Sequence, residues 1–426
     1  MAMCAYLVAE YIRPQLYVGA LANFPLGQLT LGTAAAAYAL SGARGFGTKG
    51  IGTWLLLTFT AVIFASAVGA YNPAVSFAAI NVWISWVVIY FLIISVVNTE
   101  QRFAFFIAVW LLCHFYMAQG GTRQFAMRGF RFATWGIIGA PGWFENSGEF
   151  GIAMAMLVAV SWHYYVAAKD HLTKWRKVMV LSLPVMGLLC VIGSSSRGAV
   201  VALVAIAFCA LLRTKINFKT VAWVATAAAV VWMLVPAEQK ARFSSAGTDN
   251  TSMMRKVYWL NGLEMAKSHP VLGVGYENWL TYYAATYRYS RISDEYNVHT
   301  VQLPHNIFIQ CMAELGYVGL AVFVLLIMGT AWINFQTRQL VRRGPGPPSR
   351  FIIEIAYGLD EAMLCYIIAG FFVTVLYYPF FWINLALCVA LNAIARANNR
   401  AATVRQKRPV MMRGAPVRPH GLVVPR

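Results

Sequence analysis

Hydrophobic residues dominate this chain in long continuous runs, which short polar segments separate. Residues 178–192 and 318–332 contain no charged residue, and their apolar positions do not alternate with polar ones. Inside a bilayer the backbone must satisfy its own hydrogen bonds, so continuous apolar runs predict transmembrane helices rather than barrel strands. The expected fold is therefore an all-α polytopic membrane protein.

The same pattern predicts about twelve spans. Several are shorter than the roughly 20 residues that a straight span requires, so some are expected to be tilted, broken or re-entrant. The first two are the least regular, because Arg13-Pro14 and Pro25 interrupt them. The predicted spans are 3–22, 28–41, 53–70, 79–98, 103–117, 149–168, 175–193, 198–212, 219–235, 305–333, 357–376 and 379–396.

The longest polar interval, residues 236–302, divides this series of spans. We expect nine spans in residues 1–235, a large extramembrane loop with short helices at 236–302, three more spans in 303–396, and a basic tail without regular structure at 397–426. Because nearly everything else reads as membrane helix, a loop of this size is expected to carry the function or to form a separate domain.

One helix of the loop is expected to begin at Thr251 or Ser252, which are good capping residues, and to end before Pro270. Its predicted apolar face consists of four residues, Met253, Val257, Leu260 and Leu263.

Composition supports the membrane assignment. Hydrophobic residues make up 60% of the chain and charged residues 12%, about half the charged share of a soluble domain. The seven cysteines all fall in apolar stretches without a CxxC pair, so we interpret them as buried hydrophobic residues rather than disulfides or metal ligands.

The net charge of +19 comes mainly from short loops and the tail. Positive charge next to spans is typical of cytoplasmic loops. With twelve spans, the basic loops at 169–177, 213–219 and 338–350 and the basic tail all fall on one side. We therefore expect both termini in the cytoplasm, with residues 118–148, 194–197 and 236–302 on the opposite side. Nucleic-acid binding is not expected.

The first candidate site is Ser194-Ser195-Ser196-Arg197-Gly198, at the start of a span. Serines cap helices, free N–H groups at helix starts attract anions, and the arginine fork suits phosphate. The alternative is an interfacial arginine next to a serine cap.

The second candidate is on the loop helix, where Arg255 and Lys256 precede Tyr258 and Trp259. Aromatic rings beside cations suit a sugar attached to a phosphate. The alternative is an amphipathic helix that lies on lipid headgroups.

The third candidate is His305, which follows Pro304 and is expected in the first turn of a span. The positive end of the helix dipole disfavours imidazolium, so a neutral imidazole is available to accept a proton from a hydroxyl. The alternative is a histidine that only forms interfacial hydrogen bonds. His299 is a weaker candidate for the same task.

Charged residues of the 118–148 segment and the span that follows form a fourth group. Glu145 and Glu149 would orient arginines or an acceptor, or else simply stabilise a helix start. Arg123 and Arg128, with Arg131, are placed to steer an anionic lipid-linked substrate.

Several nucleotide and metal motifs are missing from the sequence. It contains no GxxxxGK[ST], no HExxH and no Asp-x-Asp pair. Arginines rather than a divalent ion would then have to neutralise a pyrophosphate, and we predict neither a metal nor another cofactor.

Three segments together resemble the O-antigen ligase/polymerase family of bacterial envelope proteins. They are SSSRG at 194–198, MMRKVYWLNGLEMAKSHPVLGVGYENW at 253–279 and LPHNIFIQCMAELGYVGL at 303–320. The resemblance implies about twelve spans with a large periplasmic loop, in the bacterial inner membrane. It also implies transfer of a glycan from undecaprenyl pyrophosphate to lipid A–core.

The resemblance also implies roles for individual residues. Arg197 and Arg255 would hold the donor pyrophosphate, His305 would activate or position the acceptor hydroxyl, and Glu314 would orient its neighbours. Direct displacement would then invert the anomeric centre without a metal ion.

Alternatives remain at this point. Repeat-unit polymerases and protein O-glycosylation ligases belong to the same family, and the ENSGEF segment at 145–150 resembles the subgroups linked to protein or exopolysaccharide substrates. A transporter or flippase also fits twelve spans, although it is expected to show ionisable residues near the midplane and two matching halves. The sequence sets no oligomeric state.

Overall fold

The computed structural model describes residues 1–22, 24–42, 50–131, 135–213 and 249–407, with positions 222, 226, 229, 233, 237–244 and 247 between the last two ranges. Throughout that part of the chain the regular elements are helices. Seven of them are long and apolar enough to cross a membrane, which makes this a multi-pass membrane protein. They are α3 (Ile51–Val68), α4 (Pro73–Val96), α5 (Glu100–Met127), α6 (Ser147–Ala168), α7 (Lys174–Gly193), α14 (Ile307–Arg343) and α16 (Pro379–Lys407).

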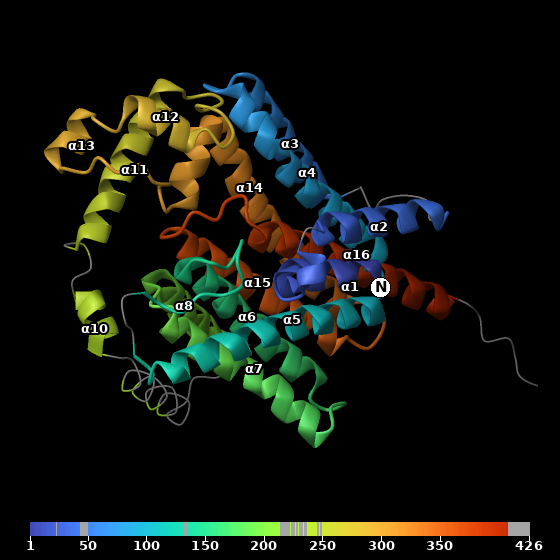
Figure 1. Ribbon diagram of the computed structural model, residues 1–426. Coiled ribbons are helices and arrows are strands. Elements are labelled where there is room, and N and C mark those ends of the chain that lie inside the picture. Colours follow the sequence, from blue (N-terminus) through green and yellow to red (C-terminus); the bar gives the residue numbers. More distant parts are fainter. Residues whose placement is uncertain are drawn as a thin grey trace, which may run out of the picture.

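Three further helices lie in the bundle, as Figure 1 shows. They are α2 (Leu26–Leu40), α8 (Arg197–Arg213) and α15 (Arg350–Gly370). The first two are short, and α15 carries several charged side chains along an otherwise apolar face. The predicted span 219–235 lies almost wholly outside the described residues, so the count of twelve stays a prediction.

The predicted spans 149–168, 175–193 and 198–212 agree with α6, α7 and α8 to within two residues at each end. The first predicted span, 3–22, is wrong. Helix α1 (Ala2–Leu7) continues as one π-helical turn, Val8–Ile12, and ends at Arg13 in the left-handed region (φ 54°). Only the short 3-10 turns Pro14–Leu16 and Gly19–Leu21 follow, because the residue before a proline is pushed out of the α region.

Several boundaries also differ from the prediction. Helix α4 begins at 73 rather than 79, α14 ends at 343 rather than 333, and α15 covers 350–370 rather than 357–376. Helix α5 covers 100–127 instead of 103–117, because polar residues continue its last turns. Helix α16 extends to Lys407, so the predicted tail at 397–426 begins too early. Asn399 stabilises this extension by donating its side-chain N–H to the carbonyl of Leu340 at 2.7 Å. Residues 408–426 lie outside the described part.

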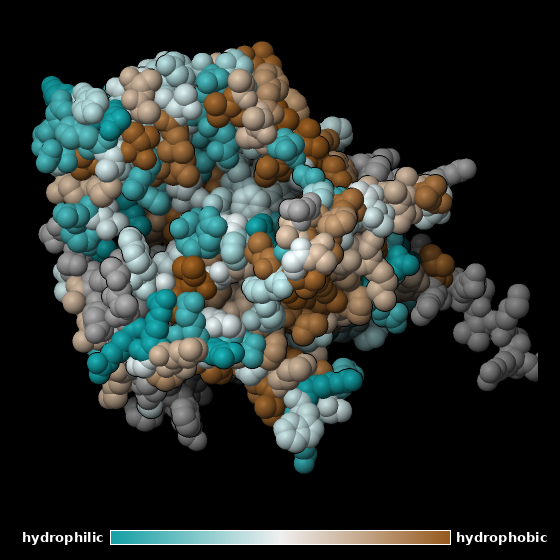
Figure 2. All heavy atoms as spheres, in the orientation of Figure 1, coloured by the Kyte–Doolittle hydropathy of each residue, from teal (hydrophilic) through white to brown (hydrophobic). Residues whose placement is uncertain are grey.

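The interval after α8 contains α10 (Ala237–Ser244) and a lobe formed by α11 (Asn250–Ser268), α12 (Trp279–Thr286) and α13 (Arg291–Glu295), seen beside α14 in Figure 1. The lobe has its own hydrophobic core, which includes Val257, Tyr258, Met265, Trp279 and Tyr283. Hydrophilic residues gather over its tip in Figure 2.

Two details of the predicted loop helix are wrong. The N-cap is Asp249 rather than Thr251 or Ser252, because the Asp249 carboxylate accepts the Ser252 backbone N–H at 2.8 Å. Leu263 is 39% exposed, since the buried face follows Val257, Asn261 and Met265 instead.

The lobe is attached to a break within α14. Gly316 has φ 70° and ψ −173°, which interrupts the helix and frees backbone groups on both sides of it. The Tyr317 N–H donates to the carbonyl of Pro270 at 2.8 Å, and the Val274 N–H donates to the carbonyl of Ala313 at 2.9 Å. The segment between α11 and α12 therefore satisfies the groups that the break exposes, which is how irregular backbone is tolerated at membrane depth.

Glu314, next to this break, is fully buried. Its carboxylate accepts the Trp279 backbone N–H at 3.1 Å and the Tyr377 hydroxyl at 2.9 Å. The side chain therefore connects α14 to the start of α12 and to the segment before α16.

Candidate active site

Arg197 is the first residue of α8. Ser195 before it takes a left-handed conformation (φ 58°), and the Ser196 hydroxyl accepts the Ala199 N–H at 3.3 Å as a helix cap. Gly198 lies directly against the residues that end α15, because a Cβ there would be 3.3 Å from Ala369. This close packing fixes the position of the first turn of α8, and with it the position of the Arg197 backbone.

Arg197 pairs with the lobe through Asp249. Its Nη2 lies 2.6 Å from Asp249 Oδ2, and the two side chains are 15% and 23% exposed. Burial alone would raise the pKa of Asp249, but the Ser252 N–H and the Arg197 guanidinium outweigh it and lower that pKa below its usual value. The carboxylate is therefore charged at neutral pH.

Helix α11 connects this ion pair to His305. Arg255 and Trp259 are four residues apart and share a face of α11. The Trp259 indole N–H donates to the carbonyl of Pro304 at 2.8 Å, directly before His305. At 1.5 Å per residue, Asp249 and Trp259 are about 15 Å apart along the helix, and Arg255 lies between them.

His305 lies before the helix rather than in its first turn, so that expectation is wrong. Asn306 is the cap of α14, and its side-chain oxygen accepts the Phe308 and Ile309 N–H groups at 2.9 and 3.1 Å. His305 itself has φ 50°, and its backbone N–H donates to the Thr374 hydroxyl at 2.9 Å.

The imidazole of His305 is electrically neutral at physiological pH. Burial, and then the positive charge of Arg255, lowers the pKa of His305 to about 4. The sequence predicted a neutral ring from the helix dipole. The structure gives the same charge state for different reasons, which are desolvation and a nearby guanidinium.

The segment between α15 and α16 joins the parts of this site. Thr374 holds the His305 backbone, Val373 packs against Gly148 in the first turn of α6, and Phe372 packs against Gly198. The first turns of α6, α8 and α14 therefore adjoin one segment, and helix starts present N–H groups and positive dipole ends. Together with Arg197 and Arg255, this arrangement suits an anion.

The other predicted lobe residues differ in what they can contact. The Lys256 ammonium lies 4.8 Å from the centre of the Tyr296 ring, in a cation–π contact. Tyr258 is fully buried, and its hydroxyl lies 2.7 Å from the Thr300 hydroxyl, so the ring belongs to the lobe core. His299 is on the outer part of the lobe, where its Nδ1 lies 3.2 Å from the carbonyl of Arg288 and 3.7 Å from Asp294.

The predicted charged residues of the 118–148 segment and of the α6 start have separate hydrogen-bond partners or are exposed. Glu149 is buried, with Asn146 Nδ2 at 3.0 Å and the Tyr378 hydroxyl at 3.2 Å from its carboxylate. Glu145 accepts the backbone N–H of Gly142 at 3.0 Å. Arg123 and Arg128 are both exposed. Their roles toward a substrate stay predictions.

Sequence reasoning missed two residues of this site, Asp249 and Thr374. Asp249 carried a detectable sign, since aspartate is among the best helix caps and it precedes Asn250-Thr251-Ser252. Thr374 carried none, because its hydrogen bond joins residues 69 positions apart.

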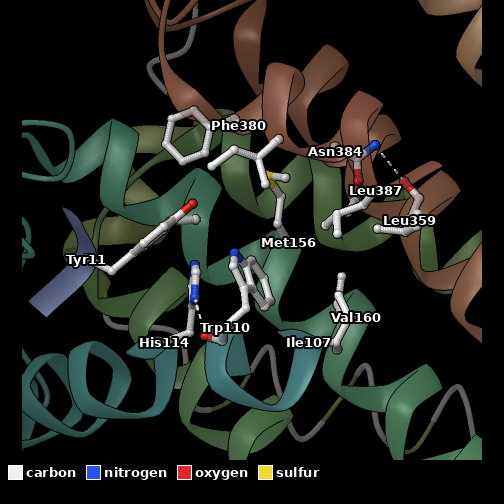
Figure 3. A pocket seen from close by; sticks show the side chains of 13 residues that line it. Tyr11, Ile107, Trp110, His114, Met156, Val160, Leu359, Phe380, Asn384 and Leu387 are labelled. Carbon is white, nitrogen blue, oxygen red and sulfur yellow. Dashed lines mark hydrogen bonds between the residues drawn. The ribbon is translucent and has the colours of Figure 1, made fainter. Parts of the chain in front are cut away.

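A separate pocket lies inside the bundle (Figure 3), between α5, α6, α15 and α16. Its lining is mostly apolar, and its polar groups have partners within the protein. The Nδ1 of His114 donates to the carbonyl of Trp110 at 2.9 Å, and the Asn384 amide donates to the carbonyl of Leu359 at 3.2 Å. None of the predicted site residues lines this pocket, so we interpret it as a feature of bundle packing.

Comparison with known proteins gives one family. A family model described as O-antigen ligase matches residues 178–324. This range contains Arg197, the whole lobe, His305 and the break in α14. The comparison with curated proteins gave no match.

Proposed function

We propose, from the match of residues 178–324 to the O-antigen ligase family, that the chain is an O-antigen ligase. The general chemistry of that family is glycan transfer. The protein would move a glycan from undecaprenyl pyrophosphate to a hydroxyl of lipid A–core. The observation that carries the proposal is the path of α11, which contacts Arg197 at its cap, bears Arg255 in its second turn, and holds the residue before His305 through Trp259.

The donor is held by charge in this proposal. Arg197 and Arg255 bind the diphosphate with charge-assisted hydrogen bonds, and the positive dipole ends of α8 and α14 add to the attraction. As the bond from the anomeric carbon to the phosphate oxygen breaks, the electron pair leaves with the diphosphate. The same arginines stabilise that growing charge.

The acceptor is activated by His305. Its neutral imidazole takes the proton of the acceptor hydroxyl while the hydroxyl oxygen attacks the anomeric carbon. One displacement inverts the anomeric configuration. The two arginines supply the positive charge that a divalent ion supplies in many nucleotide-sugar transferases, so we expect no metal requirement.

The site is proposed to face the periplasm of a bacterial inner membrane. Arg213 ends α8 at the opposite end from Arg197, and Arg342 and Arg343 end α14 far from His305. Basic residues at those ends mark the cytoplasmic side under the positive-inside rule.

The test uses the purified full chain in liposomes with an undecaprenyl-pyrophosphate-linked glycan. Either lipid A–core or free glycan is supplied as acceptor, and the products are identified by mass spectrometry. We expect transfer to lipid A–core, unaffected by EDTA. Product formed only with free glycan would make the protein a polymerase, and loss of activity with EDTA would contradict the metal-independent mechanism.

The matched pair of variants is His305→Ala and His171→Ala. His171 is an exposed histidine that follows α6, so its replacement controls for the loss of an imidazole. His305→Ala should remain folded and inserted while transfer falls by about 10²- to 10⁴-fold. Unchanged turnover in this variant would remove His305 from the mechanism.

A further inference from the structure

We propose that Asp249 is a built-in competitor of the donor diphosphate. Its carboxylate occupies Arg197 until a phosphate group displaces it, so Asp249 sets the affinity of the site for diphosphates. This inference rests on the proposed function, because it assumes that Arg197 receives the donor.

The contact between the two residues has the geometry of a phosphate contact. The distance of 2.6 Å between Arg197 Nη2 and Asp249 Oδ2 is typical of a strong charge-assisted hydrogen bond. A phosphate oxygen would use the same donor. Two anions cannot share one N–H group at this distance without repulsion, so donor and carboxylate compete for it.

Release of Arg197 leaves Asp249 with its second partner. Its other oxygen, Oδ1, accepts the Ser252 N–H at 2.8 Å and caps α11. The helix start also favours a negative charge. The carboxylate can therefore give up the arginine without losing its position, and α11 keeps its cap.

The pair is also accessible to a ligand. The two side chains are 15% and 23% exposed, so neither is sealed inside the bundle. A phosphate oxygen replaces the carboxylate charge on Arg197 while Asp249 keeps its cap, and this keeps the cost of the exchange small. The ion pair thus holds the lobe against α8 before the donor arrives.

The test measures binding of inorganic pyrophosphate to the full chain in detergent by isothermal titration calorimetry. Asp249→Asn removes the charge but keeps a residue that caps helices equally well. We expect this variant to bind pyrophosphate about three- to tenfold more tightly than the wild type. An equal or weaker affinity would overturn the inference, because it would mean that Asp249 only orients Arg197.

The control is Glu264→Gln on the same helix. Glu264 is 48% exposed and pairs with Lys267, so its replacement removes one negative charge from α11 away from Arg197. Affinity should change less than twofold. An equal gain in both variants would assign the effect to net charge and overturn the inference.

A double variant separates this inference from the proposed function. In an Arg197→Ala background, Asp249→Asn should no longer improve pyrophosphate binding, because the group under competition is gone. A gain that persists there contradicts the competition. Binding that is the same with and without Arg197 contradicts the proposed donor site itself.

Discussion

The two ends of α8 each carry an arginine paired with a carboxylate, but in different surroundings. Arg213 Nη1 lies 2.7 Å from Glu361, whose side chain is only 5% exposed. The other oxygen of Glu361 lies 3.2 Å from His163, so both oxygens are occupied. At the opposite end, Asp249 uses one oxygen for Arg197 and the other for a helix cap.

The Arg213 end is a network that joins four helices. Arg213 and Arg338 lie 4.2 and 4.5 Å from the centre of the Tyr357 ring, and Arg338 pairs with Asp360. His163 Nδ1 lies 2.9 Å from Glu354. With its charges matched inside the network, this end is suited to holding α6, α8, α14 and α15 together.

The comparison shows what distinguishes a structural arginine from one available to a ligand. Both have a carboxylate partner, so an ion pair alone does not decide the role. The difference lies in the carboxylate partner. Glu361 is 5% exposed and bridges two basic side chains, whereas Asp249 is 23% exposed and keeps the Ser252 N–H as a second partner when Arg197 leaves. The following predictions test that difference.

The largest expected effect is on catalysis at the Arg197 end. Arg197→Ala should lower kcat/KM for the lipid-linked donor by about 10²- to 10³-fold, because a charge that stabilises the leaving diphosphate is lost. The thermal unfolding midpoint should stay close to that of the wild type. A large loss of stability with normal specific activity would reverse the assignment of the two ends.

The next effect is on stability at the Arg213 end. Glu361→Ala leaves Arg213 and His163 without their shared partner. Because the Arg213 side chain is 32% exposed and water can replace part of the lost contact, the cost should be about 1–3 kcal/mol. Thermal unfolding in detergent should shift down, while the folded fraction keeps wild-type kcat. Unaltered stability would contradict the structural role of the network.

The smallest effect concerns the pH profile of transfer. His305 acts as a base only when neutral, and its lowered pKa of about 4 keeps it neutral at every pH well above that value. The kcat/KM should therefore be flat between pH 5.5 and 7.5. Arg255→Gln removes the cation that lowers this pKa, so the acid limb should move to higher pH. An acid limb near pH 6.5 in the wild type would contradict the environment described for His305.

Local sequence patterns predicted much of the fold and the main site residues. The apolar runs predicted the bounds of α6, α7 and α8 to within two residues, because a run of apolar side chains is by itself enough to favour a helix in lipid. Arg197, Arg255 and His305 were found because each occurs in a recognisable segment beside a helix start. The structure brings these segments together through α11.

The features that the sequence did not predict depend on contacts between residues far apart in the chain. The break at Gly316 lies inside an apolar run, and it depends on hydrogen bonds to Pro270 and Val274 far away in the chain. The ion pair of Arg197 with Asp249 joins residues 52 positions apart. Tyr258 was predicted to contact a sugar, but the basic and aromatic residues of the five-residue stretch 255–259 do not reveal which ring turns into the core.

The most direct measurement is an electron cryomicroscopy structure of the His305→Ala variant with an undecaprenyl-pyrophosphate-linked glycan bound. We expect phosphate oxygens within hydrogen-bond distance of Arg197 and Arg255, Asp249 moved off Arg197, and the anomeric carbon facing position 305. A diphosphate bound elsewhere, with the Arg197–Asp249 pair intact, would contradict it.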